Sequence, residues 1–377
     1  MPDVVLLAAG QGSRLRPLTH DRPKSMLVAA GQPVLHHLLT DLAALGVQDV
    51  VLVTGHGHEQ LQSFVGDGTR FGLSVRYVRQ AKQLGPGHAL LQARPQVRSQ
   101  EFVVLPVDAW YAPEVLAHLL DNEGCALLQV DDSRSGRHGV PVVRGEEVLD
   151  LEPAGSEGGR ASGGAYRLHQ RIFEALERHE FRLRESVRND IQRHGGWRAI
   201  AVPPRAYLDI IEVRDLLDLH SRLLEAVLPD IEGTVDEGAI VTGQVRIGKG
   251  SRIRAGTIIE GPAVIGEHCD IGPGAILEGG TAVRNHVRVQ PFTLLSRCIV
   301  GSNVEVGSHV RIQRAYVDRG TVIGSGVHIA GGSGSIVGAD ARLGDDAKVS
   351  PDGVVGRGAT VAPGRTVSHV PDGGMAV

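Results

Sequence analysis

A six-residue period in the C-terminal half constrains the fold of this chain more than any other feature of its sequence. Every sixth position from residue 241 to residue 295 is aliphatic: Val241, Ile247, Ile253, Ile259, Ile265, Ile271, Leu277, Val283, Val289 and Leu295. The period slips after Leu295, continues to Ile312, slips again and resumes from Val337 to Val367. Hexad repeats are typical of a parallel β-helix, in which each aliphatic residue points inward and stacks on its equivalent one coil away. The sequence therefore predicts a solenoid here, and the 50 glycines and 3% aromatic content suit its many tight turns.

The N-terminal half follows a different pattern, in which buried strands alternate with helices. Apolar runs at 3–9, 47–55 and 101–110 are separated by stretches with helical spacing, such as 33–46. Such alternation predicts βαβ units and an α/β fold with a Rossmann-like, mostly parallel sheet. The stretch 210–233 has helical spacing until Pro229, which cannot continue a helix. We therefore expect an α/β domain at 1–229, linker helix included, and a β-helix at 230–377.

Composition excludes several function classes. A net charge of −4 over 377 residues does not suggest a nucleic acid or an anionic membrane as partner. The three cysteines (Cys125, Cys269 and Cys298) lie far apart and lack metal-ligand spacing, which indicates a reducing compartment. Apolar runs stay well short of the roughly 18 residues of a membrane span, and the N-terminus leads into a strand rather than a signal peptide. We expect a cytoplasmic protein.

A glycine-rich loop follows the first strand. It reads Gly10-Gln11-Gly12-Ser13-Arg14, and Lys24 follows ten residues later. Such loops expose backbone N–H groups that bind phosphate oxygens, and ligands of α/β sheets bind beyond the carboxyl ends of strands. Asp108 also ends a predicted strand, so the two should face one crevice. The loop matches neither the Walker sequence nor the Rossmann G-x-G-x-x-G, and taken alone it is better explained as a structural turn.

The sequence around this loop favours a role in phosphate binding. "LAAGQGSRLRPLTHDRPKSM" resembles the signature of the sugar-1-phosphate nucleotidylyltransferases, L-A-x-G-x-G-[ST]-R followed by P-K. The resemblance continues through "QAKQLGPGHALLQA", Asp108, "RHGVPVV" and "YLDI", and covers most of residues 3–215. A left-handed β-helix is a common appendage in this family. The order of the two halves resembles the archaeal and bacterial bifunctional N-acetylglucosamine-1-phosphate uridylyltransferase/acetyltransferases.

The resemblance implies an enzyme that forms an NDP-sugar and pyrophosphate from an NTP and a sugar 1-phosphate. It implies that Arg14 and Lys24 are catalytic, with Arg14 on the departing phosphates and Lys24 at the α-phosphate, and that Asp108 and Asp209 hold Mg²⁺. The implied nucleotide-binding residues are Leu7, Ala8, Ala9, Gly10, Gly12, Ser13, Gln80 and Gly85. The implied sugar-binding residues are Gly139, Glu152 and Ser162. Because a glutamine amide donates and accepts at once, Gln80 favours UTP or dTTP over purine nucleotides.

Several positions depart from the family pattern. Val107 stands where a glycine precedes the metal aspartate, and Pro86 replaces a threonine of the base-reading segment. On the sugar side, the "E-K-P" element is Leu151-Glu152-Pro153 and Ser162 replaces an asparagine. These changes predict an unusual or permissive sugar pocket, or lowered activity.

The solenoid departs from the acetyltransferases too. Gln313 stands where their histidine base would be, and a glutamine does not titrate near neutral pH. We therefore expect a solenoid that serves oligomerisation, with a trimer favoured. One alternative is an acetyl-CoA-dependent acyltransferase with a new base such as His309. Another is a non-catalytic regulatory or scaffold subunit that binds a nucleotide-sugar, although Arg14, Lys24 and both metal aspartates argue against it.

Overall fold

A computed structural model of the chain describes residues 1–131, 138–156 and 160–376. Its internal contacts divide the chain into two compact units. The first, called the α/β unit below, contains Met1–Gly12, Asp21–Met26 and Val34–Ile210. The second, called the solenoid unit, contains Ser13–His20, Leu27–Pro33 and Ile211–Val377.

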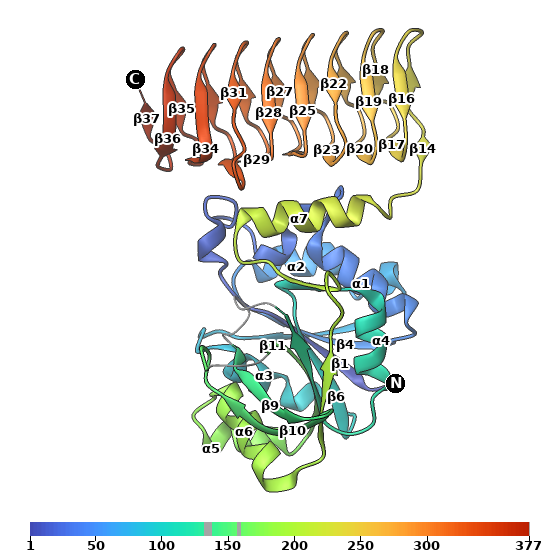
Figure 1. Ribbon diagram of the computed structural model, residues 1–377, viewed down its shortest axis with the longest axis vertical. Helices are drawn as coiled ribbons and strands as arrows, with labels where there is room; N and C mark the ends of the chain where they lie inside the picture. Colours follow the sequence, from blue (N-terminus) through green and yellow to red (C-terminus); the bar gives the residue numbers. More distant parts are fainter. Residues whose placement is uncertain (132–137, 157–159, 377) are drawn as a thin grey trace. The chain divides into compact units, whose positions relative to one another are not determined.

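The α/β unit contains a nine-stranded sheet in the order β5-β4-β1-β6-β11-β8-β12-β10-β9 (Figure 1). The strands are β1 (Asp3–Ala8), β4 (Asp49–Thr54), β5 (Ser74–Arg79), β6 (Glu101–Pro106), β8 (Ala126–Val130), β9 (Val140–Arg144), β10 (Glu147–Glu152), β11 (Ala161–His169) and β12 (Trp197–Ala201). β5, β4, β1 and β6 are all parallel, which confirms the predicted parallel-rich α/β sheet. β11 runs antiparallel to both β6 and β8, so the other side of the sheet is mixed.

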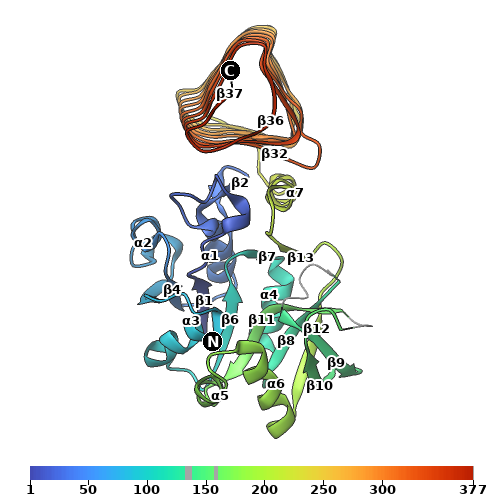
Figure 2. The ribbon, with the colours of Figure 1, turned by 90° about the vertical axis from the view of Figure 1, so that its left-hand side faces the viewer.

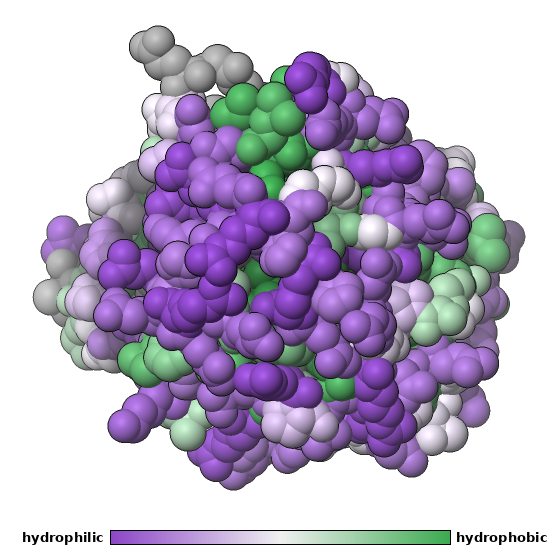
Figure 3. Space-filling view, turned by 90° about the horizontal axis from the view of Figure 1, so that it is seen from below, coloured by the Kyte–Doolittle hydropathy of each residue, from purple (hydrophilic) through white to green (hydrophobic). Residues whose placement is uncertain are grey.

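Helices cover both faces of this sheet because successive strand residues point to opposite faces. In β1, Val4 and Leu6 belong to a core cluster that includes residues of α1 and α4, whereas Val5 belongs to a second cluster with residues of α3, α5 and α6. The helices are α1 (Val34–Ala44), α2 (His58–Val65), α3 (Pro86–Ala93), α4 (Pro113–Asp121), α5 (Ile172–Arg178) and α6 (Leu183–His194). The face of this unit displayed in Figure 3 is mostly hydrophilic, with hydrophobic residues in small groups, as expected of a surface in contact with water.

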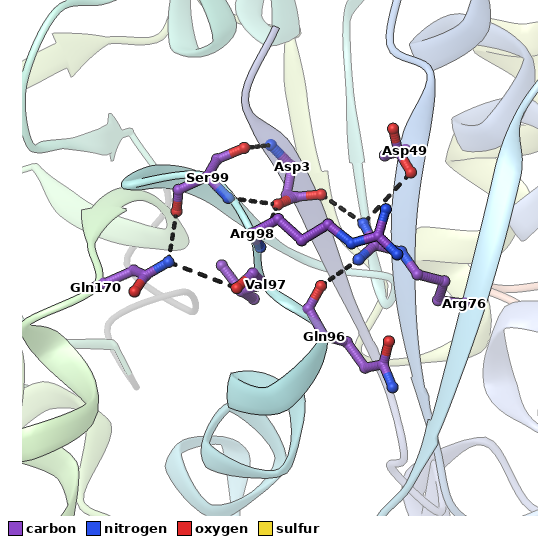
Figure 4. A network of polar contacts seen from close by, with 8 residues as sticks. All are labelled: Asp3, Asp49, Arg76, Gln96, Val97, Arg98, Ser99 and Gln170. Carbon is purple, nitrogen blue, oxygen red and sulfur yellow. Dashed lines mark hydrogen bonds and ion pairs between the residues drawn. The ribbon is translucent and has the colours of Figure 1, made fainter.

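A buried charge network fixes the start of β1 (Figure 4). The Asp3 carboxylate accepts hydrogen bonds from the backbone N–H groups of Arg98 at 2.7 Å and Ser99 at 2.8 Å, and from the Arg76 guanidinium at 2.5 Å. Burial alone would raise the pKa of Asp3, but these hydrogen bonds together lower it. The more exposed Asp49 contacts the same guanidinium at 3.4 Å. Asp3 thus joins β1 to β5 and to the loop before β6.

The solenoid unit contains a three-sided parallel β-helix, seen end-on in Figure 2. One side is formed by β14 (Asp230–Ile231), β17 (Val245–Ile247), β20 (Ala263–Ile265), β23 (Thr281–Val283), β26 (Ile299–Val300), β29 (Ala315–Val317) and β32 (Ser335–Val337). The second is formed by β15 (Thr234–Val235), β18 (Arg252–Ile253), β21 (Asp270–Ile271), β24 (Arg288–Val289), β27 (Glu305–Val306), β30 (Val322–Ile323), β33 (Arg342–Leu343), β35 (Thr360–Val361) and β37 (Met375–Ala376). The third is formed by β16 (Ile240–Thr242), β19 (Ile258–Glu260), β22 (Ile276–Leu277), β25 (Leu294–Ser296), β28 (Arg311–Gln313) and β31 (His328–Ile329). The long strand β34 (Lys348–Val355) pairs with strands of the first and third sides and is followed by β36 (Thr366–Val370).

The hexad prediction is confirmed residue by residue. From Ile247 to Leu295 every hexad aliphatic is at most 3% exposed and lies in one continuous core cluster. Ile240 pairs with Ile258 and Ile258 with Ile276, which makes a coil of three hexads. The slips are coils of different length: Leu294 pairs with Arg311 and Arg311 with His328, each one residue short of three hexads, and His328 pairs with Lys348, two residues over. The solenoid absorbs the missing or extra residues in its turns, so the inward stack continues.

The helix α7 (Val213–Leu224) precedes the first coil and belongs to the solenoid unit. Glu212 and Asp215 form a capping box at its N-terminus, which satisfies backbone N–H groups that the helix leaves open. The first solenoid strand begins at Asp230, directly after the predicted boundary at 229. Across the described residues, no helix has both the length and the apolar character needed to cross a bilayer.

Candidate active site

The glycine loop begins where β1 ends beside β4. Ala8 pairs with Thr54, and the next residues of the two strands approach very closely. A Cβ placed on Gly55 would lie 2.8 Å from the carbonyl oxygen of Ala9, so this close approach requires a glycine. Gly10 faces open space, and Gly12 has a φ of 64°. The main chain of the loop is therefore accessible, as a phosphate-binding loop requires.

A pocket of about 360 Å³ opens beside this loop within the α/β unit. Its lining consists of Gln11, Gly55, His56, Arg79, Gln80, Ala81 and Gln83. The Gln83 side-chain amide donates to the Ala9 carbonyl at 2.9 Å and so connects the pocket wall to the glycine loop. The lining is mostly polar and includes the cationic Arg79, whose guanidinium suits a phosphate group.

Gln80, predicted to read the base, lines this pocket and is 4% exposed. Its backbone N–H donates to the carbonyl of Thr54 at 2.8 Å. Its side-chain nitrogen donates to the carbonyl of Gly85 at 2.9 Å and lies 3.0 Å from His88 Nδ1. The two predicted base-reading residues are thus bonded to each other, and together they close the loop that precedes α3.

The other predicted nucleotide-binding residues divide into two groups. Gly10 and Gly12 belong to the accessible loop, whereas Ala8 and Ala9 are buried and Leu7 packs against a core cluster. The side chains of Leu7 and Ala8 are therefore core residues, and only their main chain is suited to a ligand. Sequence reasoning missed six of the seven lining residues: Gln11, Gly55, His56, Arg79, Ala81 and Gln83. Of these, Gln11, Ala81 and Gln83 stood inside the quoted motifs, but nothing in the sequence marked Gly55, His56 or Arg79.

Lys24, Asp108 and Asp209 come together in the α/β unit. Lys24 Nζ lies 3.2 Å from Asp108 Oδ2, and their side chains are 11% and 29% exposed. Asp209 ends β13 (Tyr207–Asp209), which pairs antiparallel with β7 (Ala109–Tyr111), so that Asp209 lies opposite Ala109. The Ile210 N–H also donates to the Asp108 carbonyl at 3.0 Å. Two distant aspartates are thereby adjacent in space, beside a lysine that offsets their charge.

This donor set fits Mg²⁺, which is usually held by one or two carboxylates together with waters and substrate phosphates. No group of three or more potential His, Cys, Asp or Glu ligands occurs among the described residues. A site of two carboxylates would therefore depend on phosphate oxygens to complete the coordination of the ion. Asp209 is fully buried and Asp108 is partly exposed, so Asp108 is the more accessible of the two.

Arg14 and Ser13 belong to the solenoid unit, not to the α/β unit. They lie in a short 3-10 helix, Ser13–Leu15, in which Leu15 is buried and Arg14 is exposed. An exposed guanidinium is available for a phosphate, whose oxygens match the fork of its donors.

The three predicted sugar-side residues also converge, where β9, β10 and β11 meet. A Cβ on Gly139 would lie 2.6 Å from the Glu152 carbonyl oxygen, and the Ser162 N–H donates to the Gly139 carbonyl at 2.8 Å. Ser162 is fully buried; its hydroxyl donates to Tyr166 at 3.3 Å and accepts from the Gly164 N–H. This hydroxyl is engaged inside the protein, whereas Glu152 is only half-buried. Arg137 of the quoted "RHGVPVV" segment lies outside the described residues.

The acyltransferase alternative requires a histidine base in the solenoid. His309 is exposed, and its ring centroid lies 5.3 Å from that of Phe292. No carboxylate is recorded beside this histidine in the described part of the chain, so the arrangement offers no orienting group for a base.

Comparison with known proteins places the chain. The family model described as nucleotidyl transferase matches residues 3–224. The chain belongs to the nucleotidyl transferase family. A second model, described as a GMPPB C-terminal domain, matches residues 241–334 of this nucleotidyl transferase. The predicted resemblance, a sugar-1-phosphate nucleotidyltransferase with an appended β-helix, is confirmed.

Individual relatives agree with the family. A glucose-1-phosphate thymidylyltransferase of Streptomyces antibioticus is 31% identical to this nucleotidyl transferase, over 66% of this chain and 74% of the relative. The bifunctional protein GlmU of Methanococcus maripaludis is 27% identical over 66% of this chain and 61% of its own length. A Bacillus anthracis structure assigned as a glucose-1-phosphate thymidylyltransferase, solved with sucrose, superimposes with a TM-score of 0.52 at 24% identity. It covers 58% of this chain and 94% of that chain, and supports the fold.

Proposed function

We propose that this protein joins the nucleoside monophosphate part of an NTP to a sugar 1-phosphate, releasing pyrophosphate. The observation that carries the proposal is the group formed by Lys24, Asp108 and Asp209, which lies in the same unit as the polar pocket and the glycines of the loop, Gly10 and Gly12. A pyrimidine nucleotide, UTP or dTTP, is favoured because Gln80 matches the family position that reads the base, although its side-chain nitrogen already donates to the Gly85 carbonyl. A glucose-1-phosphate thymidylyltransferase among the relatives supports this preference.

In the proposed reaction, an oxygen of the sugar phosphate attacks the α-phosphorus of the NTP. The bond between that phosphorus and the oxygen bridging to the β-phosphorus breaks, and pyrophosphate leaves with the electron pair. Reactions of this kind depend on positioning and on neutralising charge rather than on covalent catalysis. Lys24 would neutralise charge at the α-phosphate, and Arg14 would bind the departing phosphates with its fork of donors.

Asp108 and Asp209 would hold Mg²⁺, which supplies charge neutralisation at the phosphates when bound. The Asp108 carboxylate itself orients Lys24 through the 3.2 Å ion pair. On the sugar side, Glu152 is the residue available to bind hydroxyl groups, because the hydroxyl of Ser162 is already bonded to Tyr166. We further propose that the protein is a homo-oligomer, with a trimer favoured, assembled through the solenoid.

Pyrophosphate release tests the proposal. UTP, dTTP, GTP, ATP and CTP would be crossed with glucose-, galactose-, mannose-, N-acetylglucosamine- and glucosamine-1-phosphate, with Mg²⁺ and with EDTA. We expect turnover that EDTA abolishes and that Lys24→Ala and Asp108→Asn each lower by about 10²-fold or more. Lys249→Ala, an exposed lysine of the solenoid, is the matched control and should keep wild-type rates. Binding of nucleotide without turnover anywhere in the grid would favour a scaffold role. A monomer in mass photometry would contradict the oligomer.

A further inference from the structure

One segment inside the nucleotidylyltransferase signature and one directly after it belong to the solenoid unit. Ser13–His20, which carries Arg14, and Leu27–Pro33, which follows Lys24 by three residues, both group with α7 and the coils. Leu27–Pro33 contains the small hairpin of β2 (Val28–Ala29) and β3 (Gln32–Pro33). Figure 2 shows β2 and α7 next to one side of the solenoid. The main chain that carries Arg14, and the main chain that follows Lys24, therefore pack with a solenoid expected only to serve oligomerisation.

His220 of α7 is the central contact of this packing. It is fully buried, and its Nδ1 accepts a hydrogen bond from the backbone N–H of Ala30 at 2.8 Å. Its Nε2 lies 3.2 Å from the carbonyl oxygen of Gly280, a residue of the solenoid. Because Nδ1 accepts, the proton of a neutral imidazole is on Nε2 and is donated to Gly280. One ring thus bridges the segment after Lys24 and a solenoid coil, with both nitrogens used.

Two further contacts hold the same segment. The Arg284 guanidinium, from the turn after β23, donates to the carbonyl of Gly31. A Cβ on Gly31 would lie 3.1 Å from Val264, so the segment lies directly against β20. A small apolar cluster completes the contact, formed by Ala30, Leu224, Val264 and Ala282. The outward residues of this solenoid side are accordingly buried rather than exposed to solvent.

The segment with Arg14 is held at the other end of the solenoid. A Cβ on Gly338 would lie 2.9 Å from Pro17, and His20 Nδ1 lies 3.4 Å from Asp372 Oδ2. Leu15 and Leu18 are buried. Solenoid residues therefore contact the chain before and after the stretch Asp21–Met26, which contains Lys24.

We propose that the solenoid positions the segment 13–33, which carries Arg14 and Lys24, and that His220 and Arg284 are positioning residues for the nucleotidylyl transfer. This inference rests on the proposed function. Neither residue touches substrate; each acts by fixing the main chain at residues 30 and 31. A displacement of about 1 Å in a group that stabilises the transition state can lower a rate by about 10²-fold. The nucleotide pocket belongs to the α/β unit, so nucleotide binding should depend much less on these contacts.

The experiment compares four variants of the full chain. His220→Leu removes the acceptor for the Ala30 N–H, while His220→Asn keeps an acceptor at the position of Nδ1. Arg284→Ala removes the bond to Gly31. Arg254→Ala is the matched control, because this solenoid arginine bonds to Asp270 through two bonds of 2.7 Å. Each variant is measured for amide hydrogen exchange, nucleotide affinity and steady-state rates.

We expect faster exchange at residues 27–33 and a kcat lowered about tenfold or more in His220→Leu and Arg284→Ala, with nucleotide affinity unchanged within about twofold. His220→Asn should recover most of the rate, and Arg254→Ala should behave as wild type. Unchanged amide hydrogen exchange at residues 27–33 in both His220→Leu and Arg284→Ala would overturn the anchoring itself. Faster exchange with wild-type kcat, or an equal loss in Arg254→Ala, would overturn the positioning role. A wild type without turnover would overturn the proposed function and the positioning role together, while hydrogen exchange would still report the anchoring separately.

Discussion

Replacing Asp3 with asparagine should destabilise the α/β unit strongly, although the residue lies at the start of the first strand. The Asp3 side chain is 5% exposed and accepts three hydrogen bonds, one of them from the Arg76 guanidinium. Asparagine keeps one acceptor oxygen, but its amide group would face N–H donors and the guanidinium would lose its buried partner. Breaking a buried charge pair on one side costs about 3–5 kcal/mol. We expect the free energy of unfolding to fall by that amount.

Tryptophan fluorescence during guanidinium chloride unfolding measures this effect selectively, because Trp110 and Trp197 both lie in the α/β unit. Asp49→Asn is the matched control. Asp49 contacts the same Arg76 guanidinium, but its side chain is 43% exposed and 3.4 Å away. An exposed pair of this kind contributes about 0–1 kcal/mol. Equal losses in the two variants would refute the reasoning that burial determines the strength of this network.

The pH dependence of the Asp3 effect has a defined sign. Because the hydrogen bonds lower the pKa of Asp3 below its ordinary value near 3.8, the charged form stabilises the folded state. This contribution is complete above the unfolded pKa and is lost as the pH falls through the lower pKa of the folded state. The difference in unfolding free energy between wild type and Asp3→Asn should therefore be constant near neutral pH and shrink below about pH 4.

Three further predictions concern the core, the thiols and the glycine loop. Ile271→Ala should lower the unfolding free energy of the solenoid, measured by calorimetry, by about 2–5 kcal/mol, because Ile271 is fully buried in the stack. The control Ile276→Ala, at a site 38% exposed, should lower it far less. A thiol reagent at pH 8 should modify no cysteine until the protein unfolds, because all three cysteines are buried. Burial also raises the pKa of Cys125 to about 11 and of Cys298 to about 12, so little reactive thiolate is present. Rapid labelling of the folded protein would contradict this prediction. Gly55→Ala should raise the KM for the nucleotide about tenfold and lower the free energy of unfolding by about 1–3 kcal/mol, since its Cβ would push on the Ala9 backbone and move the loop; unchanged nucleotide kinetics would separate this loop from nucleotide binding.

The solenoid could be predicted from sequence because its periodicity is local. Each hexad residue points inward whatever the rest of the chain does, so Ile247 to Leu295 alone specify the stacked core. The same holds for β1, whose continuous apolar run indicates a strand buried on both faces. Part of the candidate site was predictable for a related reason. Ligands of α/β sheets bind beyond the carboxyl ends of strands. Because the glycine loop and Asp108 both follow predicted strands, we could expect them to face one crevice.

Tertiary structure alone decided what depends on long-range packing. No local pattern indicates that β11 runs antiparallel in the middle of the sheet, or that Asp209 pairs beside Asp108 through β13 and β7. The pocket residues His56 and Arg79 belong to no sequence motif. They become neighbours only because the fold places the β4–α2 connection beside the end of β5. Least predictable was the grouping of the signature segments with the solenoid. It depends on His220, whose two ring nitrogens bond to residues that lie 190 and 60 positions away in the chain, and such contacts exist only after folding.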